Sequence, residues 1–350
     1  MGLPEVRDSA PLSLLQNRRS NSATLDLNVT RPWAWCIAAA VLVFAVAASL
    51  GRPPEPQAFG DAVHAGQIEN SEIDEASGLA ASRRRSDLLW THNDSGAVPR
   101  LYAVGVDGRD HGAVDLRGAS SVDWEDLAAF EIDGVPYLLI ADTGDNDAER
   151  KSVMLYIVEE PELRGDRFED GTAVSVAWSL EVVFEDGPMD CEGVAVDVPG
   201  QRILFVSKWT VPLRLYEIPL HPSGSEVRSP AVATRVAEIA NIPQPTNADR
   251  EEDPKFGQFR SQTTALDVTA DASELLLVTY ANAYRFERAA GEGWLQAVSR
   301  PGERLAIPLM AQTEAGAYAL DGQSVFVTSE QRPSPLFRLD RVESIRPATD

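Results

Sequence analysis

The feature that most constrains the fold is a unit that occurs five times along the chain. In each unit a short run rich in small residues is followed by a turn and then by a strongly apolar run. The small-residue runs begin at Glu75, Glu125, Glu192, Thr264 and Glu314, and the apolar runs end at Asn93, Asp142, Lys208, Tyr280 and Glu330. The spacing from first to last residue is 16 to 18 in every unit. Such regularity indicates one repeated supersecondary structure.

The second unit shows what this structure is. Asp133-Gly134 lies between its two apolar runs, a pattern typical of a tight β-hairpin. The start and the end of an antiparallel hairpin lie at the same edge. We therefore expect Glu125 and Asp142 to be neighbours.

Further strands follow each hairpin. A third strand is indicated by an aromatic residue among aliphatic residues, at 101–102, 155–156, 215–216, 284–286 and 336–337. A fourth is expected at 112–116, 174–178 and 235–239. Repeats of four short strands that cannot bury their apolar faces alone are typical of a β-propeller. The sequence predicts an all-β chain with a single propeller of five blades, six being the alternative.

The N-terminal part divides the chain into four segments. Residues 1–32 are polar and are expected to be a cytoplasmic tail, and residues 33–50 are uncharged and mostly apolar, as in a short transmembrane signal anchor. The alternative is a secreted protein cleaved near Ala47. Residues 51–61 contain three prolines and predict a linker. The propeller is expected over 62–350, with a strand at 62–69 that closes the ring in the last blade.

Composition limits the partners. The formal charge of −23 disfavours nucleic acid and anionic membrane surfaces. Only two cysteines occur, one of them inside the apolar segment, so the propeller has no disulfide framework. A small molecule, a glycan or a protein segment remains as the expected partner, with membrane attachment through the N-terminal helix only. The oligomeric state is not fixed by the sequence.

The polar insertion at 242–261 joins the third unit to the fourth. It has no strand pattern and contains three prolines. We expect it to emerge on the same face as the acidic hairpin ends. A loop of this length is a lid, a binding loop or a mobile segment.

The acidic hairpin ends are the main functional signal. Crowded carboxylates repel one another unless they are solvated, protonated or bound to a cation. Calcium accepts six to eight oxygen ligands in flexible geometry, so we expect a calcium ion on this rim. The alternative is that these acids only bind backbone N–H groups between blades. The expected ligands are Glu75, Asp94, Asp123, Glu125, Asp142, Asp145, Glu192 and Glu314.

Other residues on the rim are candidates for substrate or ligand contacts. Glu125 and His92 are the candidate general bases. The candidate ligand-binding residues are Asn93, Trp124, Asn146, Lys208 and Trp209. The alternatives are a structural histidine and tryptophans that pack between blades. No nucleophile elbow, zinc-protease helix or phosphate-binding glycine loop occurs in the sequence.

Three blocks resemble a known family. Residues 90–96 (WTHNDSG), 122–127 (VDWEDL) and 140–146 (IADTGDN) resemble blocks of an uncharacterised family of exported bacterial β-propeller proteins. Residues 77–80 (SGLA) and the Glu192-Gly193 pair are more distantly similar to the phytase-like (esterase-like) and SdiA-regulated propeller families. The resemblance covers roughly residues 70–340. It implies a propeller with bound calcium, although Thr264 departs from the repeated glutamate.

Two functions follow from these observations. The first is a membrane-anchored extracytoplasmic propeller that binds a ligand or partner at a calcium-bearing rim. The second is a metal-dependent hydrolase of phosphate or carboxylate esters, in which Glu125 or His92 activates water.

Overall fold

The computed structural model describes residues 57–94, 96, 98–220, 230–330 and 332–342. The expected tail, the expected signal anchor and most of the expected linker lie outside the described residues. In the part of the chain that is described, no helix is long and apolar enough to cross a membrane.

The strands fall into groups that follow the repeated units. The first group contains β2 (Ala76–Ala81), β3 (Leu88–Asn93), β4 (Arg100–Gly105) and β5 (Asp110–Arg117), and the second β6 (Trp124–Ile132), β7 (Val135–Asp142), β8 (Val153–Glu159) and β10 (Trp178–Phe184). The third contains β11 (Cys191–Asp197), β12 (Arg202–Ser207), β13 (Leu213–Pro219) and β14 (Ala231–Ile239). The fourth contains β15 (Thr263–Val268), β16 (Glu274–Thr279), β17 (Ala283–Glu287) and β18 (Glu303–Leu305). The last contains β19 (Thr313–Tyr318), β20 (Ser324–Ser329), β21 (Pro335–Asp340) and β1 (Val63–Gln67).

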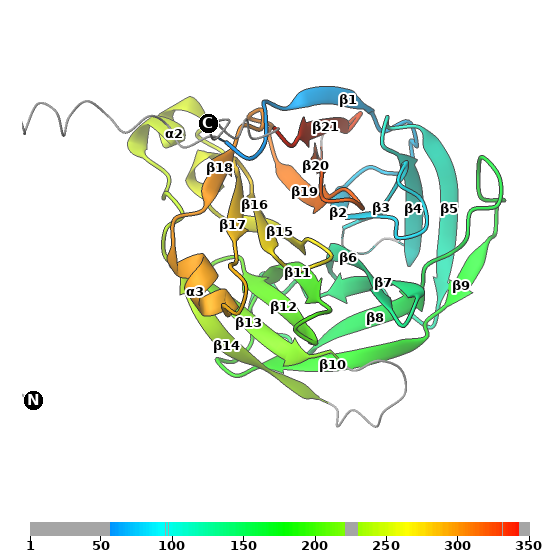
Figure 1. The fold of residues 1–350 in the computed structure, drawn as a ribbon, viewed down its shortest axis with the longest axis horizontal. Helices are drawn as coiled ribbons and strands as arrows, with labels where there is room; N and C mark the ends of the chain where they lie inside the picture. The colour runs from blue at the N-terminus through cyan, green and yellow to red at the C-terminus, as the bar shows by residue number, and fades with distance from the viewer. Residues whose placement is uncertain (1–56, 95, 97, 221–229, 331, 343–350) are drawn as a thin grey trace, which may run out of the picture. The chain divides into compact units, whose positions relative to one another are not determined.

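The first strands of these groups form a ring. β2, β6, β11, β15 and β19 contact one another in this order, and β19 contacts β2 again. Figure 1 shows the groups arranged radially around these inner strands. Each group is antiparallel and runs outward in sequence order, except that β1, from the start of the chain, is the outer strand of the last group. This arrangement is a β-propeller, as the sequence predicts, and all five predicted third strands are present as β4, β8, β13, β17 and β21.

Apolar side chains fill the space between successive groups. The five largest clusters of buried residues each join strands of two neighbouring groups; for example, Leu155 and Phe205 share one cluster and Leu215 and Phe286 share another. Every residue of β2, β11, β15 and β19 is buried. Each inner strand lies between two neighbouring groups and is buried on both faces. This explains why its sequence is a continuous run of small and apolar residues.

The N-terminal strand closes the ring. β1 pairs antiparallel with β21, as expected from residues 62–69, and the two ribbons lie side by side in Figure 1. Phe59, which the sequence analysis assigns to the linker, is only 2 % exposed and bridges to Arg341. The ordered pairing therefore begins before residue 62.

The outer edges differ from the prediction in one unit. A fourth strand was expected at 174–178, but the fourth strand of the second group is β10, and β9 (Ala173–Ser175) pairs in parallel with β5 of the first group. β10 in turn pairs in parallel with β14. Each of these pairings covers an outer edge that would otherwise expose backbone N–H and C=O groups.

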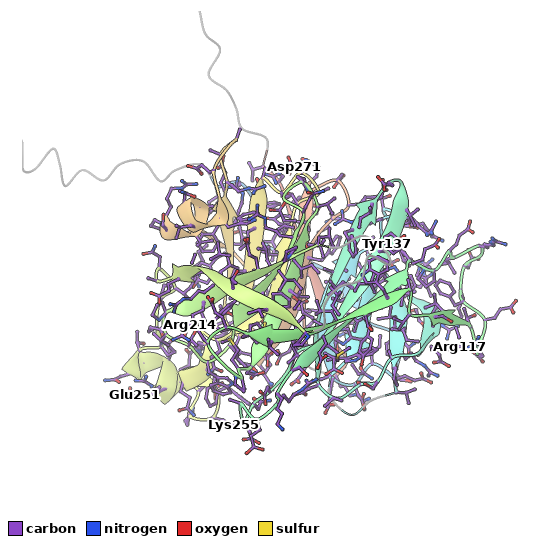
Figure 2. All side chains as sticks on the ribbon, turned by 90° about the horizontal axis from the view of Figure 1, so that it is seen from below. Arg117, Tyr137, Arg214, Glu251, Lys255 and Asp271 are labelled. Carbon is purple, nitrogen blue, oxygen red and sulfur yellow. The ribbon has the colours of Figure 1, made fainter. Side chains whose placement is uncertain are left out.

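The insertion at 242–261 contains α2 (Asn247–Glu252) and the 3-10 turn η1 (Gly257–Phe259), and α3 (Trp294–Ser299) covers β14 and β17. Thr246 and Asp249 form a capping box that starts α2. In Figure 2, Glu251 and Lys255 lie at the opposite end of the ring from Asp271, which is in the β15–β16 turn. The insertion therefore emerges on the face where the inner strands begin, as expected.

Candidate functional site

One backbone feature recurs near the start of the inner strands. Every inner strand carries a register shift near its start, between residues 77/79, 124/126, 191/193, 263/265 and 313/315. A β-bulge inserts an extra residue and re-aims its side chain. The inserted residues are Gly78, Glu125, Glu192, Thr264 and Glu314.

Three of the bulged residues and their neighbours form the candidate site, which we call the central cluster. It contains Asp94, Asp123, Glu125, Asp190, Glu192, Glu314 and Lys208. One carboxylate oxygen from each of Asp94, Asp123 and Glu125 lies within 4.8 Å of the others, and the same holds for Glu125, Asp190 and Glu192. Glu125 belongs to both groups. The residues of the central cluster come from four units, so only the closed ring brings them together.

Lys208 is the cation of the second carboxylate group. Its Nζ bonds Glu192 Oε1 and lies 3.8 Å from Asp190 Oδ2. The ammonium also lies 5.6 Å from the ring centroid of Trp209 and 5.8 Å from that of Tyr280. Burial by itself lowers the pKa of Lys208, but Glu192, Tyr280, Asp190 and Glu125 together outweigh it and the net shift is upward. The side chain is therefore charged.

The carboxylates of the central cluster hold protons more tightly than isolated acids. Burial raises the pKa of Asp123 to about 6, and the charges of Asp94 and Asp190 add to the shift. Burial and the charge of Glu192 raise the pKa of Glu125 well above its usual value. The pKa of Glu314 is raised in the same way, by burial and by Glu192. A single lysine does not offset this repulsion, so the site favours a further positive charge.

Gly144 lies against the first carboxylate group. A Cβ atom at this position would overlap Glu125 Oε1 and Asp123 Oδ2. The loop backbone is held there because Gly144 N donates to Asp123 O at 3.1 Å and Gly144 O accepts from Arg150 at 2.7 Å. A larger residue would displace the carboxylates, so glycine is a requirement of the site's geometry.

Asp142 and Asp145 organise this loop. Asp142 is fully buried, pairs with Arg150 at 2.8 Å and accepts the backbone N–H groups of residues 122 and 123. Its strand position is opposite Trp124, one residue from Glu125, as the hairpin predicts. Asp145 accepts the N–H groups of residues 149 and 150. The oxygens of these two predicted ligands therefore accept backbone N–H groups, one of them from Asp123 of the central cluster, and Asp142 also pairs with the Arg150 guanidinium.

His92, Trp124 and Asn93 lie in the protein interior. The His92 side chain is completely buried, contacts the edge of Trp124 with ring centroids 5.4 Å apart, and bonds Asn93 O through Nδ1. Burial lowers the pKa of His92 to about 4, so the ring is neutral at pH 7. Trp124 Nε1 donates to Ser120 O at 2.8 Å. Asn93 binds the backbone of the preceding loop through both its side-chain oxygen and its nitrogen.

The remaining predicted residues lie at the edge of the site. Trp209 is 47 % exposed, donates to Asp190 Oδ2 at 2.7 Å and contacts Phe259 edge-on. Asn146 is exposed. Glu75 is exposed as well, and its charge, after burial, raises the pKa of Glu330. The bulge of the first unit falls at Gly78, so Glu75 does not occupy the position of Glu125 in its own unit.

Three residues that shape the site are not among the predicted ligands or general bases. Asp190 joins the second carboxylate group, and Tyr280 occupies in the fourth unit the strand-end position that Lys208 has in the third. Asp126 is 1 % exposed, and its Oδ2 accepts the N–H groups of Val194 and Leu266 at 2.8 and 3.0 Å. It thereby joins the inner strands of three units. The repeat alignment contained the signal for Tyr280, because it ends the fourth apolar run.

The comparisons with known proteins are limited to fold-level likeness. No family model and no curated protein matches the sequence. The Cps50 (Swd1) β-propeller domain of Myceliophteria thermophila matches with a TM-score of 0.38 and 16 % identity, over 84 % of this chain and 72 % of that chain. The PQQ-bound aldose sugar dehydrogenase of Streptomyces coelicolor matches with a TM-score of 0.40 and 10 % identity, over 82 % of this chain and 99 % of that chain.

Proposed function

We propose that this protein is a five-bladed propeller that binds its ligand at a calcium-dependent site on the central cluster. The five strand groups are taken as the five blades. The ligand is a small molecule, a glycan or a protein segment. The proposal rests on the unequal charge compensation of the two carboxylate groups that share Glu125.

The second carboxylate group already has its own cation, since Lys208 pairs with Glu192 and Asp190. In contrast, Asp123 and Glu125 make no salt bridge with any of the described residues. Arg150, which lowers the pKa of Asp123, is paired with Asp142. An added cation is therefore expected to have its most favourable electrostatic interaction with the Asp94–Asp123–Glu125 group.

The donor set favours calcium over other common metals. The three side chains offer only carboxylate oxygens, and neither carboxylate group includes a histidine or cysteine. Zinc prefers nitrogen and sulfur ligands, whereas calcium accepts six to eight oxygens without strict geometry. The half-buried Asp94 and Asp123 leave one side open for water or for a ligand oxygen. A bound calcium would polarise that oxygen and orient the ligand.

The direct test is a calcium titration of the purified full-length chain after metal removal. At a calcium concentration of about 100 times the dissociation constant, binding should add about 2.7 kcal/mol to the free energy of unfolding. For a chain of this size this is a rise of about 5 °C in the melting temperature. Isothermal calorimetry should give one site.

Two variants sharpen the test. Asp123→Asn should weaken calcium binding at least about tenfold because one anionic ligand is lost. Glu287→Gln is the matched control, because its side chain is 71 % exposed and lies in the fourth unit. Equal calcium affinity in the two variants, or no binding to the wild type, would contradict the proposal.

An ester hydrolase is the second candidate, and the surroundings of Glu125 favour it. A buried carboxyl with a raised pKa beside a lysine and a metal can act as a general base. His92 is buried behind Trp124, so Glu125 is the stronger candidate of the two. Hydrolysis of p-nitrophenyl phosphate or acetate that requires calcium and is lost in Glu125→Gln would establish this function. Calcium binding without turnover would reject the hydrolase and support the ligand-binding function.

We also propose that the domain is extracytoplasmic and is anchored by residues 33–50. The support is the apolar run of the sequence and the arginines before it. Protease added to intact cells, or to spheroplasts if the cell has an outer membrane, should remove the propeller. Protection of the domain in spheroplasts would contradict this orientation.

A further inference from the structure

A cavity of about 380 Å³ lies at the other end of the ring from the central cluster. It is lined by residues of the β2–β3 turn, of the β6–β7 hairpin end and of the segment after β8. Both hairpin ends follow an inner strand, as the Asp271 turn does, so they lie on the face opposite the insertion. The volume is within the range of small-molecule sites. The charged residues of the lining are Arg83, Arg84, Arg85, Glu131 and Glu162.

Buried groups fix the conformation of the β2–β3 turn. Glu160 is 1 % exposed, and its carboxylate accepts the Ser82 hydroxyl, the Arg83 N–H at 2.9 Å and the Trp90 indole N–H at 3.0 Å. Ser82 Oγ in turn accepts the backbone N–H groups of residues 84 and 85 at 3.1 and 3.0 Å. The turn that carries the three consecutive arginines is therefore held by a buried network.

Two of the guanidinium groups are oriented by main-chain carbonyl groups. Arg83 donates from Nε and Nη2 to Ala129 O, at 2.9 and 2.6 Å. Arg84 donates from Nε to Glu160 O at 2.8 Å and from Nη2 to Glu159 at 3.0 Å. Neither Nη1 atom has a hydrogen-bond acceptor among the described residues. Each Nη1 is therefore available to donate to water or to a ligand.

Three of the five charged residues of the lining are already paired. The pairs are Arg84 with Glu159, Arg85 with Asp87, and Glu162 with Arg164. In contrast, Arg83 and Glu131 form no ion pair with any residue that the structure describes. Burial raises the pKa of Asp267 to about 6 and the charge of Arg83 offsets part of that shift, but the Asp267 oxygens accept the backbone N–H groups of residues 268 and 318. The cavity thus has one positive and one negative group without an ion-pair partner.

The two unpaired groups lie along the same part of β6. The Arg83 guanidinium is bonded to Ala129 O, and Glu131 follows Ala129 by two residues. Side chains two residues apart in a strand point to the same face and are separated by about 7 Å. A ligand that carries an ammonium and a carboxylate on one carbon atom can bridge such a gap, because each end adds a charge-assisted hydrogen bond of about 2.8 Å.

We propose that this cavity binds a free α-amino acid with an aliphatic side chain. The carboxylate of the ligand accepts hydrogen bonds from Nη1 of Arg83 and Arg84, and its ammonium donates to Glu131. The aliphatic side chain packs against Pro136 and Leu163, which line the same cavity. The site shares no residue with the carboxylate groups of the central cluster, so this inference goes beyond the proposed function and does not depend on it.

Probes that differ in charge test the class of ligand, with calorimetry on the full-length chain. Leucine carries both charges, 4-methylpentanoate lacks the ammonium, and 3-methylbutylamine lacks the carboxylate. Leucine should bind at least about tenfold more tightly than either singly charged probe, because each of these loses a hydrogen bond between charged groups. Leucyl-leucine, whose charges are further apart, should bind more weakly than leucine. Equal binding of leucine and a singly charged probe, or no leucine binding at millimolar concentration, would overturn the inference.

The positive end of the site is tested by Arg83→Gln. This variant should weaken leucine binding at least about tenfold, because the charged donor to the carboxylate is lost. Arg109→Gln is the matched control, since its side chain is 67 % exposed and pairs only with Asp107 at 3.5 Å. It should leave leucine binding unchanged.

The negative end is tested by Glu131→Gln, which changes an exposed side chain. Leucine should bind this variant several-fold more weakly, whereas 4-methylpentanoate should bind it more tightly than the wild type because the repulsion between two carboxylates is removed. Such opposite changes cannot arise from misfolding. Glu287→Gln, with a side chain that is 71 % exposed, should change neither affinity. Leucine binding that is unchanged in both Arg83→Gln and Glu131→Gln would contradict the proposal.

Calcium titration separates this inference from the proposed function. Glu131→Gln should keep the calcium affinity of the wild type, and Asp123→Asn should keep its leucine affinity. Leucine binding without calcium binding would refute the calcium site alone. Calcium binding without leucine binding would refute this inference alone.

Discussion

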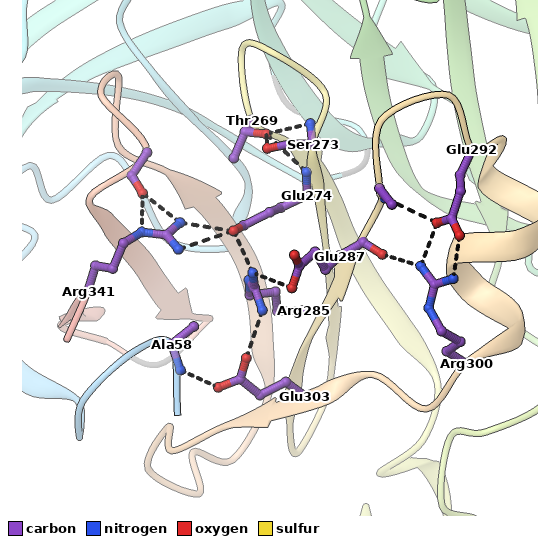
Figure 3. Close-up of polar contacts among 12 residues, drawn as sticks. Ala58, Thr269, Ser273, Glu274, Arg285, Glu287, Glu292, Arg300, Glu303 and Arg341 are labelled. Atoms are coloured by element: carbon purple, nitrogen blue, oxygen red, sulfur yellow. Dashed lines mark hydrogen bonds and ion pairs between the residues drawn. The ribbon is translucent and has the colours of Figure 1, made fainter. Parts of the chain in front are cut away.

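Two groups of buried carboxylates in this propeller have opposite electrostatic surroundings. At the ring closure, Glu274 bonds Arg285 at 2.7 Å and Arg341 at 3.0 Å (Figure 3). Burial alone raises the pKa of Glu274, but the two guanidinium groups outweigh it and the net shift is downward. In the central cluster, burial and neighbouring acids raise the pKa values of Glu125 and Glu314.

The difference separates a structural network from a candidate binding site. In the closure network, Arg285 also bonds Glu303, and Glu303 accepts the backbone N–H of Ala58. These contacts join the N-terminal segment to the fourth unit, and each drawn carboxylate has a partner. The central cluster has more anionic than cationic groups, which costs stability. A protein tolerates such a cost mainly where a bound group relieves it.

The largest effect is expected in the closure network. Glu274→Gln leaves two guanidinium groups without their shared carboxylate in a site where Glu274 is 8 % exposed. Loss of one partner from a buried ion pair costs about 3 kcal/mol. Urea unfolding of the full-length chain should show this decrease in the free energy of unfolding. A decrease below about 1 kcal/mol would mean that the network is as weak as a surface salt bridge.

The central cluster should determine how the stability of the metal-free protein changes with pH. The pKa of Asp123 is about 6 in the folded protein against an ordinary 3.8, and that of Glu192 is about 8 against 4.5. At pH values between the ordinary pKa and the folded pKa of each group, the folded state binds more protons than the unfolded state. The free energy of unfolding therefore falls as pH rises. The melting temperature should therefore decrease from pH 5 to pH 8.

Calcium supplies the control for this pH effect. The bound ion compensates the carboxylates, so saturating calcium should flatten the decrease. At low pH protons compete for the same oxygens, and the calcium affinity should fall as pH drops below about 6, the pKa of Asp123. A metal-free melting temperature that rises steadily from pH 5 to pH 8 would contradict the assigned shifts.

The smallest effect has the opposite sign to the first. Glu125→Gln removes one repelling charge from a residue that makes no salt bridge among the described residues. The metal-free variant should be more stable than the wild type by about 1 kcal/mol at pH 8, measured by urea unfolding. The same variant should lose most of its calcium affinity. If Glu125→Gln destabilised the metal-free chain as strongly as Glu274→Gln, the carboxylates of the central cluster would be as stabilising as those of the closure network, which would contradict the comparison.

The sequence contains enough information to predict the ring. The regular hairpin spacing, the Asp133-Gly134 turn and the aromatic third strands predict the propeller and its closure by an N-terminal strand, because these are local patterns. The edge pairing of β9 with β5 is a contact between units, and the expected strand at 174–178 is therefore displaced. Local periodicity cannot report which unit covers an outer edge.

The candidate site is less predictable because it depends on single-residue bulges. The extra residue is a glutamate at 125, 192 and 314, while in the first unit it is Gly78 rather than Glu75. Asp142 pairs with Arg150 and accepts the backbone N–H of Asp123. Which acids meet across the ring is fixed by the closure of all the units, and no segment of the sequence encodes it alone.

The central claim is that a calcium ion lies among Asp94, Asp123 and Glu125. The most direct measurement is an anomalous difference map from crystals of the full-length chain, or of the propeller if the N-terminal segment prevents crystallisation, grown with calcium and collected at a long wavelength. The account predicts one strong peak within about 2.3 to 2.6 Å of oxygens from these three residues. A map without a peak there, at a calcium concentration that saturates the protein in solution, would contradict it.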